Sequence, residues 1–231
     1  MKNLSISVIY FIIGLICIIL LNQPSFLPGL ISKVLIIPVL VILFLVNLNP
    51  RKDRLHALML SGLFLSWAGD VVLEFSNNNG NMFLTGLVCF LLAHIMYFIV
   101  FFITPGRNSI VTNRVWLLIP VIMYGLVLVF YLYADLSEMR LPVIIYAAVI
   151  LTMLSGAINR IEKVNRKSYY LVLAGAVLFV ISDSSIAINK FSYQFESSGI
   201  VIMSTYIVAQ YLIVAGYISQ FRSCGRDQIT R

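Results

Sequence analysis

The sequence is poor in charge. Only 11% of its 231 residues are Asp, Glu, Lys or Arg, whereas 61% are hydrophobic, and the mean hydropathy is +0.99. So few charged side chains cannot cover the surface of a water-soluble globule of this size. The composition therefore excludes the soluble classes of protein and predicts an integral membrane protein.

Cysteine and histidine are also scarce, with three and two copies. Cys17 and Cys89 fall in apolar segments and Cys224 in the C-terminal tail, and their spacing suits neither a metal site nor a disulfide framework. His56 lies at the end of an apolar run, which leaves His94 as the one histidine placed well inside a membrane segment. We therefore expect neither a metal ion nor another cofactor.

Eight apolar runs each approach the ~20 residues that cross a bilayer core. The polar segments between them are short, without a linker or a low-complexity stretch. We predict an all-α polytopic membrane protein with a single domain, residues 1–231, formed by a bundle of eight transmembrane helices. The predicted spans are 4–21, 27–48, 55–75, 82–104, 114–134, 141–158, 168–189 and 199–221.

The net charge of +7 follows this topology and does not indicate a nucleic-acid partner. Of the 16 basic residues, Lys33, Arg140 and Lys190 fall on one side of an eight-helix path and the other 13 on the opposite side. Basic residues are in excess on the cytoplasmic side of membrane proteins. We therefore predict a multi-pass protein of the cell (inner) membrane with both termini in the cytoplasm. The residues on the basic side are Lys2, Arg51, Lys52, Arg54, Arg107, Arg114, Arg160, Lys163, Arg166, Lys167, Arg222, Arg226 and Arg231.

Two acidic residues, Asp70 and Asp183, lie well inside long apolar runs. An ionised Asp near the middle of a bilayer costs about 2.5–3.5 kcal/mol on insertion scales, so such a residue is typical of a functional site. Asp70 shares a helical face with Gly62, Ser66 and Glu74, because these residues recur every four positions. Small residues alone would indicate only close helix packing. A carboxylate adds nothing to such packing, which favours a functional interpretation of this face.

The two acids occupy matching positions in a weak internal repeat of four plus four parallel helices. Gly62 precedes Asp70 by eight residues, and Gly175 precedes Asp183 by the same eight. Each acid also follows a basic residue by 16 positions, a helical rise of about 24 Å. We expect both carboxylates at one depth, in the outer half of the membrane, facing a shared cavity.

Further polar residues on the predicted helices are candidates to contact a substrate there. Lys33 can either extend to the membrane interface or turn inward toward a carboxylate. A lone His in an apolar helix is more often a hydrogen-bonded packing residue than a ligand, and a buried Tyr or Gln needs a partner. The candidate substrate-binding residues are Lys33, Glu74, His94, Tyr97, Tyr146, Asn189, Lys190, Tyr206 and Gln210.

Two carboxylates at one level in a low dielectric cannot both stay ionised cheaply, so one is expected to hold a proton while the other is charged. Glycosidases use such a pair to cleave acetals through an oxocarbenium-like transition state. A membrane enzyme would meet a bond that yields the same cation in the vinyl ether of a plasmalogen. The residues do not show which Asp is the acid.

Short motifs around these positions match a known family. They are Lys33, Gly69-Asp70 with Leu73, Ala93-His94 with Tyr97, Tyr146-Ala147, Ser182-Asp183 with Ala187 and Asn189-Lys190-Phe191, Thr205-Tyr206, and Ala209-Gln210. In these motifs the chain resembles the YhhN family of membrane proteins, and the motif at 182–191 is the most specific. The resemblance implies an eight-helix bundle with Asp70 and Asp183 as the family's essential aspartates. It also implies a lysoplasmalogenase, which hydrolyses the vinyl ether of a lysophospholipid to a fatty aldehyde and glycerophosphoethanolamine or glycerophosphocholine.

Two other classes remain open. A transporter could use the acids as a proton or cation relay, but a relay needs polar stations across the membrane, and stretches such as residues 171–176 are apolar. A purely structural or interaction protein would leave both acids unexplained. We therefore favour a lipid-hydrolysing enzyme, with a proton- or cation-coupled transporter as the alternative and no protein partner predicted.

Overall fold

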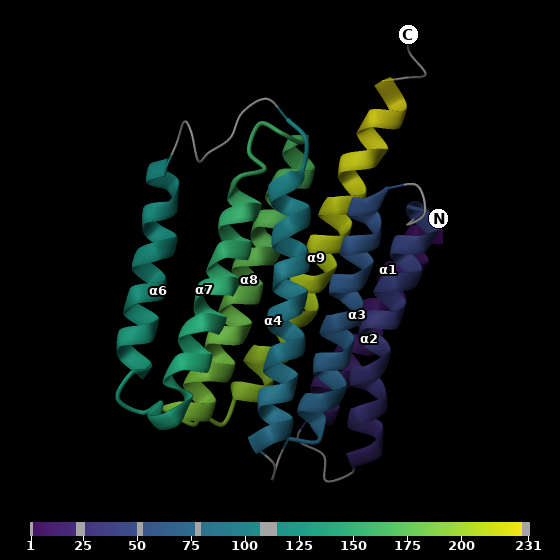
Figure 1. Ribbon diagram of the computed structural model, residues 1–231. Helices are drawn as coiled ribbons and strands as arrows, with labels where there is room; N and C mark the ends of the chain where they lie inside the picture. Colours follow the sequence, from purple (N-terminus) through teal and green to yellow (C-terminus); the bar gives the residue numbers. More distant parts are fainter. Residues whose placement is uncertain (1, 22–25, 50–52, 77–79, 107–114, 228–231) are drawn as a thin grey trace. The chain divides into compact units, whose positions relative to one another are not determined.

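The computed structural model describes residues 2–21, 26–49, 53–76, 80–106 and 115–227. These residues are largely helical, and eight helices are long and apolar enough to cross a membrane (Figure 1). In a bilayer each backbone polar group must be satisfied within the protein, which an apolar helix achieves by itself. The predicted all-α class and the eight spans are confirmed.

The chain divides into two compact units, Met1–Tyr97 and Phe98–Arg231, and the boundary along the sequence falls near the middle of the predicted four-plus-four repeat. The predicted single domain stays a prediction. The first unit contains α1 (Lys2–Leu20), α2 (Phe26–Asn47), α3 (Arg54–Glu74) and most of α4 (Gly80–Ile103). The second contains the end of α4, the 3₁₀ turns η1 (Val115–Leu118) and η2 (Ser137–Met139), and the helices α6 (Ile119–Leu132), α7 (Arg140–Ile158), α8 (Arg166–Phe191) and α9 (Ser198–Asp227).

Local sequence signals explain several helix ends. The side chain of Asp53 accepts a hydrogen bond from the backbone N–H of Leu55 at 2.9 Å, and Asn165 accepts one from Ser168 at 2.8 Å, so each caps the helix that follows. Pro120 lies in the first turn of α6, where its missing N–H leaves no helical bond unmade. These caps start α3 and α8, the two helices that carry the membrane aspartates.

In the first unit α3 packs closely on α4 through glycines. A Cβ added to Gly62 would lie 2.6 Å from the ring of Tyr97, and one added to Gly69 would lie 2.7 Å from the ring of Phe90. Small residues let two helices approach in this way. Gly62 belongs to the predicted inward face of α3, and that face is buried at Ser66 and Asp70 as well.

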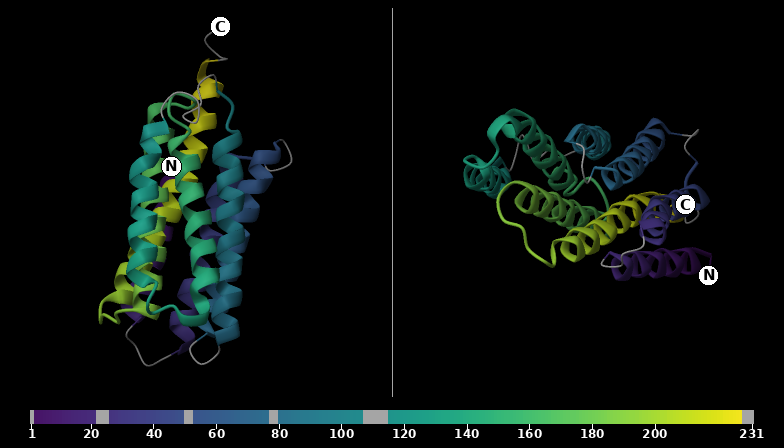
Figure 2. Two further views of the ribbon diagram at one scale, coloured as in Figure 1. Left: turned by 60° about the vertical axis from the view of Figure 1, so that its left-hand side comes forward. Right: turned by 90° about the horizontal axis from the view of Figure 1, so that it is seen from below.

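In the second unit α8 and α9 run side by side along most of their length (Figures 1 and 2). A Cβ on Gly175 would lie 2.8 Å from the carbonyl oxygen of Ala209, and one on Gly216 would lie 2.8 Å from the side chain of Val172. The contact is therefore close at two levels. Gly175 is the residue that precedes Asp183 by eight positions, as Gly62 precedes Asp70, so each repeated glycine supports a close helix contact.

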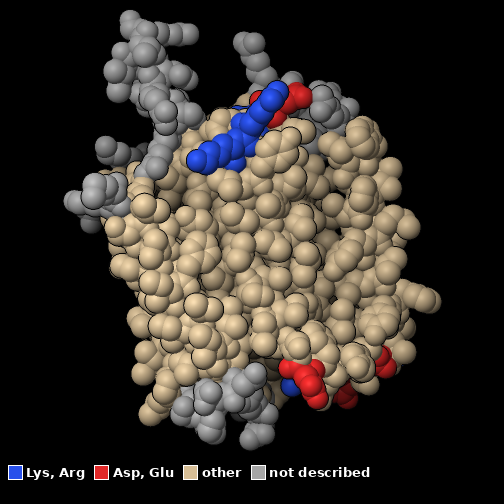
Figure 3. All heavy atoms as spheres, turned by 180° about the vertical axis from the view of Figure 1, so that it is seen from behind, with Lys and Arg blue, Asp and Glu red and all other residues tan. Residues whose placement is uncertain are grey.

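Many large apolar side chains are exposed among the described residues. Figure 3 shows a face with its charged side chains near the two ends and a broad uncharged band between them. Large side chains such as Phe130 and Trp116 are exposed, as expected of residues that contact lipid tails.

The cytoplasmic placement of the termini stays a prediction. Many of the basic residues that motivate it, or their side chains, lie outside the part of the chain that the structure describes. These are Arg51, Lys52, Arg107, Arg114 and Arg231, and the side chains of Lys2, Arg222 and Arg226.

Candidate functional site

In the first unit the candidate acid Asp70 is buried, with 3% of its surface exposed. It lies on α3 one turn after Ser66, which is also buried, and one turn before Glu74, which is partly exposed. The spacing of four residues places all three on one face of the helix. The predicted polar face of α3 is therefore directed into the protein.

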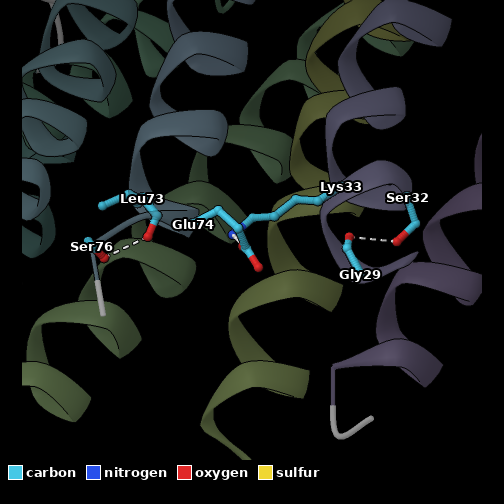
Figure 4. A network of polar contacts seen from close by, with 6 residues as sticks. All are labelled: Gly29, Ser32, Lys33, Leu73, Glu74 and Ser76. Carbon is cyan, nitrogen blue, oxygen red and sulfur yellow. Dashed lines mark hydrogen bonds and ion pairs between the residues drawn. The ribbon is translucent and has the colours of Figure 1, made fainter. Parts of the chain in front are cut away.

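Glu74 at the end of this face forms an ion pair with Lys33 of α2. The Nζ of Lys33 lies 3.1 Å from Oε2 of Glu74, and 17% and 24% of the two side chains are exposed (Figure 4). The sequence left open whether Lys33 extends to the interface or turns toward a carboxylate. It turns inward, and the carboxylate with which it pairs is Glu74.

A cysteine of α1 also lies near the polar groups of α2 and α3. The buried thiol of Cys17 interacts with Ser32 and lies within the electrostatic range of Lys33, Asp70 and Glu74. The thiol therefore lies near the polar side chains of α2 and α3. Nothing in the sequence indicated that Cys17 lies there.

The two α4 candidates, His94 and Tyr97, are both fully buried. The ring of Tyr97 lies against Gly62 of α3. Both are interior residues of the first unit.

In the second unit the candidate acid Asp183 is 8% exposed and accepts a hydrogen bond from a tyrosine. The hydroxyl of Tyr146 on α7 donates to Oδ2 of Asp183 on α8 at 2.5 Å. Both residues were candidates, and the structure brings them together. A carboxylate oxygen that accepts from a buried hydroxyl has a fixed direction, which suits a group that must meet a reacting atom.

The residues on either side of Asp183 are held by two further helices. Ser182 donates from Oγ to the carbonyl of Ile202 on α9 at 3.0 Å, and the hydroxyl of Tyr124 on α6 donates to Oγ of Ser184 at 2.8 Å. The acid is thus at the point where α6, α7 and α9 all contact α8. Nothing in the sequence singles out Tyr124, because a tyrosine in an aliphatic helix carries no signal of its partner.

The remaining candidates of the second unit separate into two groups. Gln210 is fully buried and its Nε2 donates to the hydroxyl of Tyr206 at 3.4 Å, as their spacing of one turn suggested. Asn189 instead accepts from the backbone N–H of Phe195 at 3.3 Å, which fixes the connection between α8 and α9. Lys190 is exposed at the end of α8.

Asp70 and Asp183 belong to different units, so their predicted shared cavity stays a prediction. Within the ranges that the structure describes, no three His, Cys, Asp or Glu side chains gather in a way that could hold a metal ion.

Eight apolar helices, with one buried aspartate in each unit, define a multi-pass membrane protein that has acidic side chains in its interior. The sequence model of the YhhN family matches residues 29–217. The chain belongs to the YhhN family. No solved structure matches it.

Curated relatives of known name are similar over most of the chain. The lysoplasmalogenase TMEM86B of Sus scrofa is 28% identical over 192 residues, which cover 83% of this chain and 76% of the relative. The lysoplasmalogenase TMEM86A of Bos taurus is 32% identical over 169 residues, covering 71% and 65%. The TMEM86A of Homo sapiens, also named a lysoplasmalogenase, is 29% identical over 187 residues, covering 79% and 72%.

Proposed function

We propose that this protein is a lysoplasmalogenase, a hydrolase that cleaves the vinyl ether bond of a lysophospholipid within the membrane. The names of the relatives support the activity at the level of the family. The observation that carries the proposal for this chain is the buried carboxylate of Asp183 with a tyrosine hydroxyl directed at it. A buried acid in a membrane helix is costly and is kept where it has a use.

We assign the roles of base and cation stabiliser to Asp183 and the role of proton donor to Asp70. The hydroxyl of Tyr146 donates its proton to Oδ2, and a donor of this kind matches an ionised carboxylate, which only accepts. Acid and base must differ in charge at the start of the reaction, so the proton falls to Asp70, which is also buried.

The reaction then follows in three steps. Asp70 gives its proton to the β-carbon of the vinyl ether, and the electron pair of the double bond forms the new C–H bond, which leaves an oxocarbenium ion next to the negative charge of Asp183. Water adds to that cation while Asp183 takes one of its protons, giving a hemiacetal. Asp183 then gives this proton to the ether oxygen as the C–O bond breaks, while Asp70 takes the hydroxyl proton of the hemiacetal. The products are a fatty aldehyde and a glycerophospho-alcohol, and both acids return to their starting charges.

The other candidates would bind and orient the lipid. Lys190 is exposed at the end of α8 and could contact the phosphate of the head group, whereas the charge of Lys33 is already paired with Glu74. The proposed substrate-binding residues are Lys33, Glu74, His94, Tyr97, Tyr146, Asn189, Lys190, Tyr206 and Gln210.

The test is incubation of the purified protein with a lysoplasmalogen and, separately, with its saturated-ether analogue, while aldehyde release is measured. The saturated ether has no double bond to protonate, so we expect aldehyde from the vinyl ether alone. Equal cleavage of both lipids would contradict the mechanism. Cleavage of neither would contradict the proposed function and favour a proton- or cation-coupled transporter.

A further inference from the structure

The end of the second unit that lies away from Asp183 contains a fully buried arginine. Arg160 follows the end of α7 and has 0% of its surface exposed. Its contact residue Ser168 precedes Asp183 by 15 positions on α8, which corresponds to about 22 Å along the helix. The proposed hydrolysis does not use Arg160.

The guanidinium of Arg160 is only partly satisfied by the chain. Its Nη2 donates to Oγ of Ser168 at 2.7 Å and to Oε1 of Gln220 at 3.1 Å, and its Cζ lies 5.4 Å from the ring centre of Phe101. Its Nε and Nη1 have no hydrogen-bond partner. Among the described residues an ion pair joins Lys33 and Glu74, and none includes Arg160. Burial lowers the pKa of Arg160 to about 10, so the group is still a cation at neutral pH. A buried cation without an anion is strongly unfavourable.

The helix end that Arg160 contacts is positive, whereas Tyr217 is the neighbour that favours the charge of Arg160. Ser168 lies in the first turn of α8, whose N-terminus carries a partial positive charge, and Arg166 and Lys167 lie exposed in the same turn. The C-terminus of α7 has the opposite polarity and could have stabilised Arg160 through its last carbonyl groups. It does not do so through Nε or Nη1, because neither donates to any acceptor.

We infer that Arg160 and the N-terminus of α8 form a binding site for a phosphate group. The N–H donors of a guanidinium and the positive end of a helix dipole both suit phosphate oxygens. Arg160 lies two residues beyond the apolar span that ends at Ile158, at the depth where phospholipid head groups begin. The phosphate can therefore come from a membrane phospholipid or from inorganic phosphate.

Entry of the phosphate requires one contact to open, because Arg160 is covered. Gln220 is only half-buried, and its bond to Nη2 is the longer of the two. Displacement of the Gln220 amide releases one hydrogen bond of Nη2 and leaves its bond to Ser168 in place.

The site can be tested by thermal unfolding of the full-length protein in an uncharged maltoside detergent. One arm adds sodium phosphate against sodium chloride at equal ionic strength, and the other adds phosphatidylglycerol against an uncharged glycolipid. A ligand of the native state raises the melting temperature, by roughly 5–10 °C at one hundred times its dissociation constant. We expect a rise with phosphatidylglycerol; a rise with inorganic phosphate as well would show that the phosphate group alone is sufficient.

Variants show whether the response comes from this site. Arg160→Gln should weaken the apparent affinity at least tenfold, whereas Lys167→Gln, an exposed basic residue in the same turn of α8, should leave it within about twofold. If Arg160→Gln does not fold, Arg160→Lys keeps the charge but loses two of the five N–H donors and the planar fork that binds two phosphate oxygens at once, and should show the same tenfold loss. No response of the wild type to either additive, or an equal response in the Arg160 variants, would overturn the inference.

Discussion

Tyr146→Phe removes a single oxygen atom and tests whether the hydroxyl that contacts Asp183 acts in catalysis. The hydroxyl donates to Oδ2 of Asp183, and a hydrogen bond to a charged group contributes about 1.5–3 kcal/mol. If Asp183 acts as the ionised base, this energy is lost from the transition state. We therefore expect kcat/KM for the lysoplasmalogen to fall by roughly 10- to 150-fold.

The matched control is Tyr124→Phe, which makes the same chemical change next to the same acid. Tyr124 donates to the neutral hydroxyl of Ser184, so its loss should cost about 0.5–1.5 kcal/mol of stability and leave the rate within about threefold. Aldehyde release gives the rate, and far-ultraviolet circular dichroism during heating gives the stability of both variants. Activity of Tyr146→Phe within threefold of the wild type, or an equal loss in both variants, would refute the assigned role of Tyr146.

The remaining predictions concern the two acids, the helix contacts and the buried cation. Asp70→Asn and Asp183→Asn should each nearly abolish aldehyde release without unfolding the protein, and the double variant should be scarcely slower than either, because groups that act as a unit are not additive; additive losses would contradict this. Gly175→Ala should lower the free energy of unfolding by about 1–3 kcal/mol, because its Cβ would lie 2.8 Å from a backbone oxygen. Gly80→Ala, whose Cβ would have no atom within 4 Å, should not lower it. Equal effects of the two substitutions would contradict the close contact of α8 and α9. Burial lowers the folded-state pKa of Arg160 below its ordinary value, to about 10, so the unfolded chain binds more protons above that pH. The charge therefore destabilises the fold below about pH 10, by about 3 kcal/mol. Arg160→Met removes that cost and also two hydrogen bonds of about 1.5 kcal/mol each, so the free energy of unfolding at pH 7 in phosphate-free detergent should change by less than about 1 kcal/mol; a fall of more than about 3 kcal/mol would show that the chain itself already compensates the charge.

The sequence by itself determined the membrane class, the eight helices and the inward face of α3. Each follows from a requirement that acts along a single helix: the length of apolar chain that crosses a bilayer, and the repeat of 3.6 residues that aligns Gly62, Ser66 and Asp70. The motifs from Lys33 to Gln210 also sufficed to assign the YhhN family, which the family match confirms.

Contacts between helices were decided only by the tertiary structure. Sequence spacing does not fix how one helix is rotated against the next, so it could not show that Tyr146 contacts Asp183 or that Lys33 forms an ion pair with Glu74. Arg160 is the clearest case. In the sequence it is one of the basic residues between two predicted spans, where a long charged side chain normally reaches water. In the structure, packing against α8 and α9 buries its charge. The sequence could not show this, because the residues that bond to it lie 8 and 60 positions further along the chain.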